Sequence, residues 1–134
     1  MVTNIETKYF EGIGRRKSAT ARVRIVASNK ENFIINERPI DDYFKIESQA
    51  LNARKAILGD FAGSYSVSVH VSGGGPSAQS DAVRLGLARA VIKHKPDARV
   101  AVKKAKLLKR DSREVERKMF GKKKSRKSSQ WSKR

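Results

Sequence analysis

Cationic side chains are concentrated at the C-terminal end of this chain, where they could bind a polyanion. Residues 99–134 carry 16 Lys or Arg against 3 Asp or Glu, whereas the preceding residues carry 15 against 10. The segment ends in GKKKSRKSSQWSKR, whose apolar residues are too sparse to bury a core. A self-repelling segment of this kind does not order by itself and needs an anionic partner. The pattern predicts that this partner is nucleic acid.

A glycine triplet is a candidate for backbone contact with phosphate. It lies in the motif GGGPSAQ, between a predicted strand and a predicted helix. Glycine permits positive φ, and a helix N-terminus presents free amide groups. A Walker loop needs Gly-Lys-Ser/Thr and a dinucleotide fingerprint needs GxGxxG, and the sequence has neither. We therefore favour a tight turn that RNA approaches at Gly73, Gly74 and Gly75.

A second candidate is the segment GIGRRKSAT, which combines two glycines and two hydroxyl side chains with three consecutive cations. Alone, it would be explained equally well as a solvated turn. The strand predicted after it presents further cations on one face. Together they favour a phosphate-contact surface made by Arg15, Arg16, Lys17, Arg22 and Arg24.

No group of side chains indicates catalysis. His70 and His94 are too few and too far apart for a metal site, and we expect ordinary surface or helix-end positions for both. The carboxylates considered as acid–base pairs are Asp41, Asp42, Glu114 and Glu116. They are better explained as helix caps and partners of arginine. Cysteine is absent, which excludes disulfides and thiolate metal sites, and we expect neither an enzyme nor a cofactor.

Two aromatic side chains, Phe120 and Trp131, lie within the basic segment. Each could anchor that segment on a neighbouring surface, or stack on an unpaired base or ribose. The sequence leaves both alternatives open.

Periodic patterns predict the strands that position these residues. Alternating side chains predict strands over 8–14, 19–26 and 64–71, and a short strand over 33–36. The inward face of the second strand should carry Ala19, Ala21, Val23 and Ile25. The inward face of the last strand should carry Tyr65, Val67, Val69 and Val71.

Helical spacing predicts a helix over 47–58, after a short turn capped by Asp41 or Asp42, with Ala50, Leu51, Ala53, Ile57 and Leu58 forming its apolar stripe. A second helix is predicted over 78–95, and a further basic helix over 98–108. In the second helix, Gly86 and Ala88 are small enough to let it approach a sheet closely. The order β-β-β-α-β-α, with antiparallel strands, predicts an α+β two-layer sandwich.

The length of 134 residues suits one globular domain over 1–98 and a basic C-terminal helix with an extended tail over 99–134. No apolar run approaches the roughly 20 residues of a membrane span, and the N-terminus lacks a signal pattern. We expect a soluble, cytoplasmic protein with no membrane partner.

Several blocks resemble the ribosomal protein S-nine family of the small subunit: GRRKSATARVRI, GGGPSAQSDAVRLGLARA and LLKRDSREVERKMFGKKKSRKSSQWSKR. The resemblance runs from about Tyr9 to Arg134. The chain departs from the family pattern at Ser112, Ala78 and Met119, and the first of these puts the turn geometry near Asp111 in doubt.

The resemblance implies a structural protein of the small-subunit head with a fold like the second domain of ribosomal protein S5. The globular part would dock on the 3′ major domain of small-subunit ribosomal RNA (rRNA), beside neighbouring ribosomal proteins. The tail would reach the anticodon stem-loop of P-site tRNA through Ser132, Lys133 and Arg134. The rRNA path of the tail would be lined by Lys122, Lys123, Lys124, Arg126 and Lys127. Gln79, Arg84 and Arg89 belong to the motifs that carry the resemblance and are further candidates for rRNA contact.

Three other classes of function remain as alternatives. A basic architectural protein that binds DNA would need a dimerising element or a groove-reading helix, and neither is evident. A nucleotide-processing enzyme would depend on GGGPS alone. A membrane-surface protein is disfavoured because the basic segment lacks an amphipathic apolar face.

Overall fold

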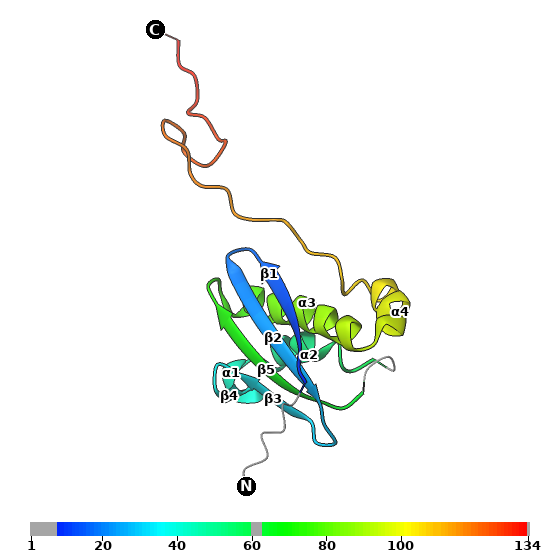
Figure 1. Ribbon diagram of the computed structural model, residues 1–134. Helices are drawn as coiled ribbons and strands as arrows, with labels where there is room; N and C mark the ends of the chain where they lie inside the picture. The colour runs from blue at the N-terminus through cyan, green and yellow to red at the C-terminus, as the bar shows by residue number, and fades with distance from the viewer. Residues whose placement is uncertain (1–7, 60–62, 134) are drawn as a thin grey trace.

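The computed structural model describes residues 8–59 and 63–133 and has a mixed five-stranded sheet in the order β1-β2-β5-β3-β4 (Figure 1). The strands are β1 (Phe10–Arg16), β2 (Ala19–Ala27), β3 (Asn32–Ile35), β4 (Arg38–Pro39) and β5 (Tyr65–Ser72). The helices are α1 (Ile40–Tyr43), α2 (Glu47–Arg54), α3 (Pro76–His94), the 3-10 turn η1 (Pro96–Ala98) and α4 (Arg99–Lys104). The mixture of sheet and helices is compatible with the predicted α+β class.

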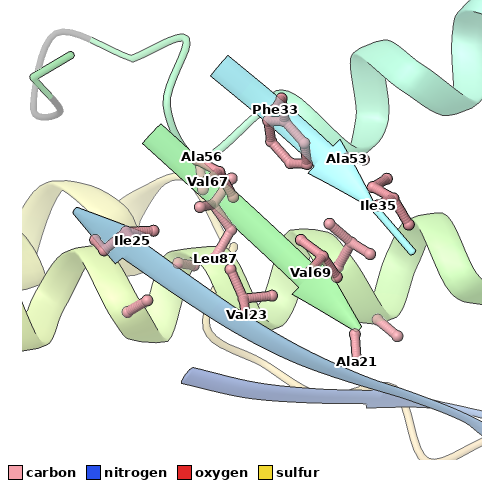
Figure 2. Packing of buried hydrophobic residues seen from close by; sticks show 14 of the residues in the cluster. Ala21, Val23, Ile25, Phe33, Ile35, Ala53, Ala56, Val67, Val69 and Leu87 are labelled. Carbon is pink, nitrogen blue, oxygen red and sulfur yellow. The ribbon is translucent and has the colours of Figure 1, made fainter. Parts of the chain in front are cut away.

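The long strands alternate as predicted, and their inward side chains form the core. The predicted inward residues of β2 and of β5 are all buried. Figure 2 shows Val23, Val67 and Val69 gathered in one cluster with Leu87 of α3 and Ala53 of α2. One expectation was wrong: β3 pairs with β5 in parallel, not antiparallel. The connection through β4, α1 and α2 is long enough for the crossover that a parallel pair requires.

Helix α3 packs directly on the backbone of the edge strand β1. A Cβ atom added at Gly86 would lie 2.8 Å from Cγ2 of Val23 and 3.0 Å from the amide nitrogen of Gly14. A Cβ at Gly14 would lie 2.5 Å from the amide nitrogen of Gly86 and would overlap the carbonyl oxygen of Ala82. The close approach predicted from Gly86 and Ala88 is therefore confirmed, and β1 contributes glycines that complete it.

The region before β5 differs from its prediction in two respects. Helix α1 has Pro39 at its N-cap and no side-chain cap, so neither Asp41 nor Asp42 caps it. Helix α2 ends at Arg54, four residues before the predicted end, and Leu51 and Leu58 are exposed. Beyond Arg54 the chain continues as a turn from which Ala56 is buried and Ile57 packs on the core, so packing rather than helix propensity sets this end.

The C-terminal segment begins as part of the packed structure. Val102 of α4 and Leu107 belong to the buried cluster, so the start of this segment is part of the core. Residues 109–133 contain no helix or strand, and Figure 1 shows them leading away from the sheet. Within the described residues, no helix is long and apolar enough to cross a membrane.

Candidate nucleic-acid interface

The three consecutive cations that were predicted to act together do not lie on one surface, because β1 directs the side chains of the first two to different sides. Arg15 is exposed, whereas Arg16 projects toward α3, because successive side chains of a strand face opposite sides. The guanidinium of Arg16 pairs with Asp111 and lies 3.6 Å from a carboxylate oxygen of Asp81. Lys17, in the following turn, is exposed and has a φ of 50°. Arg15 and Lys17 are thus available to a ligand, while Arg16 is engaged inside the protein.

The pair between Arg16 and Asp111 fixes the start of the basic tail on the globular part. Asp111 also accepts hydrogen bonds from Arg113, at 3.0 Å from Nε and 2.7 Å from Nη2. These bonds from Arg113, and the one from Arg16, hold the pKa of the Asp111 carboxyl well below its ordinary value. The turn around Ser112, which the sequence left in doubt, is therefore a tight arrangement around one carboxylate.

The two cations predicted on β2 lie on the face of the sheet opposite the helices. Arg22 and Arg24 are exposed by 59% and 49% of their side chains, and both approach Glu11, at 3.4 and 3.5 Å. The Arg24 guanidinium also lies 5.0 Å from the centre of the Tyr9 ring. Glu37 and His70 line the same hollow as the two arginines, and His70 of β5 lies opposite Arg22. Both arginines remain half exposed and can reach a phosphate, but two carboxylates reduce the free positive charge of this face.

The structure brings the glycine triplet and the GIGRRKSAT turn together. Gly73 and Gly74 adopt the positive φ that glycine permits, of 76° and 62°, whereas Gly75 has a φ of −107°. A Cβ atom at Gly73 would lie 2.5 Å from the carbonyl oxygen of Ser18, and one at Gly74 would lie 3.0 Å from Cβ of Ala19. Gly75 precedes α3 and has open space around it. The two segments therefore form a single surface at one end of the sheet.

Gln79, Arg84 and Arg89 mainly hold elements of the fold together. Gln79 donates to the carbonyl of Gly73 at 2.9 Å and accepts from Tyr43 at 2.6 Å. Arg84 donates to Asn52 at 3.1 Å and lies 3.5 Å from Asp81. Arg89 is exposed and donates to the carbonyl of Ile13 at 2.7 Å, which fastens α3 to β1.

The tail is not straight, because it closes a loop on itself. Arg126 binds Glu116 through two hydrogen bonds, of 2.9 and 2.6 Å, and Ser125 donates to the Glu116 carbonyl at 2.8 Å. This loop, visible in Figure 1, leaves exposed the predicted cations Lys122, Lys123, Lys124 and Lys127. The predicted extended conformation is therefore interrupted here by a loop that an exposed, bidentate arginine–carboxylate pair closes.

The end of the tail is exposed as far as the structure describes it. Ser132 and Lys133 are exposed, and Arg134 lies outside the described residues. Trp131 and Phe120 are both exposed, so neither packs on the globular part of this chain. Either ring is accessible to a partner.

The family model of "Ribosomal protein S9/S16" matches residues 14–134. This chain belongs to that family. The protein "Small ribosomal subunit protein uS9" of Chlorobium luteolum is 46% identical over 126 residues, which are 93% of this chain and 97% of that protein. The protein of the same name from Mycobacterium tuberculosis is 46% identical over 127 residues, which are 93% of this chain and 83% of that protein.

In this member of the family, sequence reasoning missed one group of cations. A groove of about 960 Å³ lies between α3, α4 and the start of the tail, with Arg99, Lys103, Lys106, Lys109 and Arg110 among its lining residues. The sequence did predict a basic helix here, but not that the chain would turn back after it. The turn depends on the backbone conformation of Lys106, which has a φ of 59° and which the sequence does not predict. The only sign of the groove in the sequence is therefore the spacing of its basic residues.

Within the described residues, no three His, Cys, Asp or Glu side chains are grouped so that they could hold a metal ion.

Proposed function

We propose that this chain is a structural constituent of the small ribosomal subunit, in the cytoplasm, and has no catalytic role. In this proposal it binds small-subunit rRNA in the head, beside neighbouring ribosomal proteins, and its tail contacts the anticodon stem-loop of P-site tRNA. Membership of the family and the names of its relatives support the ribosomal assignment. The rRNA and tRNA contacts are our extension from the surfaces described above.

The exposed lysines of the tail carry this proposal. Among the described residues, every ion pair is made by an arginine, and no lysine lies within ion-pair distance of a carboxylate. Such cations release condensed counterions when they meet phosphates, which favours binding to a polyanion. The residues proposed for the tail's rRNA path are Lys122, Lys123, Lys124, Arg126 and Lys127. We retain Arg126 because its surface pair with Glu116 can exchange for a phosphate at small cost.

The surface at the end of the sheet would hold the globular part on rRNA. It is formed by Arg15, Lys17, Gly73, Gly74 and Gly75, where the two candidate segments meet. Arg22 and Arg24 on the open face of the sheet, and Arg89 on α3, would add phosphate contacts. Recognition of this kind depends on RNA shape and backbone more than on base edges.

We propose the division of roles along the chain at residue 98. Residues 1–98 would form the globular RNA-binding domain, with a fold like the second domain of ribosomal protein S5. Residues 99–134 would form the basic helix and the tail, although α4 also packs on the core through Val102.

Removing the tail should separate assembly from tRNA binding. We expect a chain that lacks residues 121–134 to enter small subunits, while those subunits bind tRNA in the P site less tightly than the parent does. Filter binding of tRNA to purified subunits measures the effect. A matched control deletes residues 121–131 and keeps Ser132, Lys133 and Arg134 on a shortened tail, which cannot reach as far.

The proposed tRNA contact is wrong if subunits with the full truncation bind tRNA like the parent. An equal loss in the shortened control would show that the contact needs the length of residues 121–131, whereas a smaller loss in the control would assign the difference to Ser132, Lys133 and Arg134.

A further inference from the structure

We propose that the groove at the base of the tail is a binding site for the sugar–phosphate backbone of RNA, and that Lys106 occupies a strained conformation that places a charge in it. This inference rests on the proposed function and adds a contact surface for the same RNA partner.

The groove has a strongly positive lining with no free negative charge in the described structure. Five exposed cations line it, none within ion-pair distance of a described carboxylate: Arg99, Lys103, Lys106, Lys109 and Arg110. Its acidic residue, Asp111, is already paired with Arg16 and Arg113. Arg84, at the groove wall, is held by Asp81 and Asn52. The groove therefore presents unpaired positive charge to whatever enters it.

The arrangement of the cations suits a chain of phosphates rather than one anion. Arg99 and Lys103 are four residues apart on α4 and so share one face of that helix. Lys109 and Arg110 lie on the segment that returns past the helix, across the groove of about 960 Å³. A single phosphate would engage only part of this lining, whereas a nucleic-acid strand presents successive phosphates along its length.

Lys106 has a backbone conformation that favours glycine. Its φ is 59°, in the left-handed region. The Lys106 amide donates to the Lys103 carbonyl at 3.0 Å, and the Leu107 amide donates to the Val102 carbonyl at 3.2 Å. These two bonds, with Leu107 and Val102 both buried, form the Schellman motif that ends α4.

Glycine is the usual residue at the left-handed position of this motif, because a side chain there is strained. A lysine at this position lowers stability relative to glycine, while its exposed ammonium group lies at the groove. Three other non-glycine residues, Lys17, Asn36 and Glu37, also have positive φ, so strain by itself assigns no role to a side chain. The role of Lys106 is inferred from its position among the unpaired cations that line the groove.

Replacing Lys106 with glycine should separate stability from RNA binding. We expect Lys106→Gly to unfold at the same or a higher temperature than the parent, while its affinity for transcribed small-subunit rRNA falls roughly fivefold at about 100 mM KCl. The slope of log affinity against log salt should decrease by about one. Filter binding across KCl concentrations and thermal unfolding followed by circular dichroism measure both effects.

The matched control is Lys30→Gly, which removes the same charge from an exposed turn between β2 and β3. A second pair of variants keeps the backbone of Lys106 unchanged: Lys103→Gln with Lys109→Gln, compared with Lys45→Gln and Lys55→Gln in the turns that flank α2. We expect the groove variants to lose affinity and the controls to stay within about twofold of the parent.

Groove variants that bind rRNA like their controls would overturn the groove site, and a lower unfolding temperature for Lys106→Gly would overturn the strain argument. The proposed function fails separately, if the parent chain binds duplex DNA as tightly as rRNA at equal salt.

Discussion

The globular part pairs more of its positive charge with carboxylates of this chain than the basic tail does. In the globular part, arginines bind carboxylates of this chain, as Arg16 does with Asp111 and Asp81, and Arg54 with Asp41. From α4 onward, lysines are frequent and none of the described ones is paired. A guanidinium has a planar set of donors that fits a fixed carboxylate, whereas an ammonium group remains hydrated. Arg113 and Arg126 of the tail are paired in the same way, with Asp111 and Glu116, so the count of basic residues overstates the free charge in both regions, and more so in the first.

The largest expected effect is on the stability of the globular part, which depends on close packing between α3 and β1. We expect Gly14→Val to destabilise the fold by about 3 kcal/mol or more, because its Cβ would overlap the carbonyl of Ala82 in α3. The thermal transition measured by circular dichroism should be lost or lowered by more than about 10 °C. Gly75→Ala, whose Cβ meets nothing within 4 Å, is the control.

In the same Gly14→Val variant, salt-dependent binding to RNA should persist in part, because the unpaired lysines of the tail do not require the core. A complete loss of RNA binding would show that the tail depends on the globular part, and would break the comparison.

The neighbouring residues Arg15 and Arg16 give an effect of intermediate size. Arg16→Ala leaves the carboxylates of Asp81 and Asp111 without their shared partner, and we expect it to cost about 1–3 kcal/mol of stability. Arg15→Ala should change stability by less than about 0.5 kcal/mol and instead reduce rRNA affinity. Denaturant unfolding and filter binding on both variants make the comparison. Equal losses of stability would contradict the assignment of the two side chains to opposite faces.

The smallest expected effect is the pH dependence of the turn around Asp111. Hydrogen bonds from Arg113 and Arg16 lower the pKa of Asp111 in the folded protein. Its contribution is therefore fully present above the unfolded pKa, about 3.9, and is lost as pH falls toward the lower folded value. The Arg113 amide, which donates to Asp111 at 2.9 Å, should keep its NMR chemical shift down to below pH 4. In Asp111→Asn this signal should move to a different position at every pH. A shift that titrates near 4 in the parent would contradict the pairing.

Much of the fold was accessible from local patterns. The alternation of Ala19 to Ile25 and of Tyr65 to Val71 predicted two strands and their buried faces, because successive side chains of a strand point to opposite faces of the sheet. Helix α3 ends at His94, one residue before the predicted end, because Pro96 disfavours helix in the residue before it. The end of α2 and the parallel pairing of β3 depended on which surfaces were available for packing, and these were missed.

The sequence by itself determined that the chain carries a cationic segment, that the glycine triplet can form a tight turn, and to which family the chain belongs. Only the tertiary structure decided which cations remain free. Arg15 and Arg16 are adjacent and identical in type, yet one is exposed and the other is paired with carboxylates 65 and 95 positions further along the chain, Asp81 and Asp111. The same holds for Lys106, whose charge lies in the groove because α4 ends in a left-handed turn there. Charge is a property of composition, but its availability depends on partners that folding brings from distant positions.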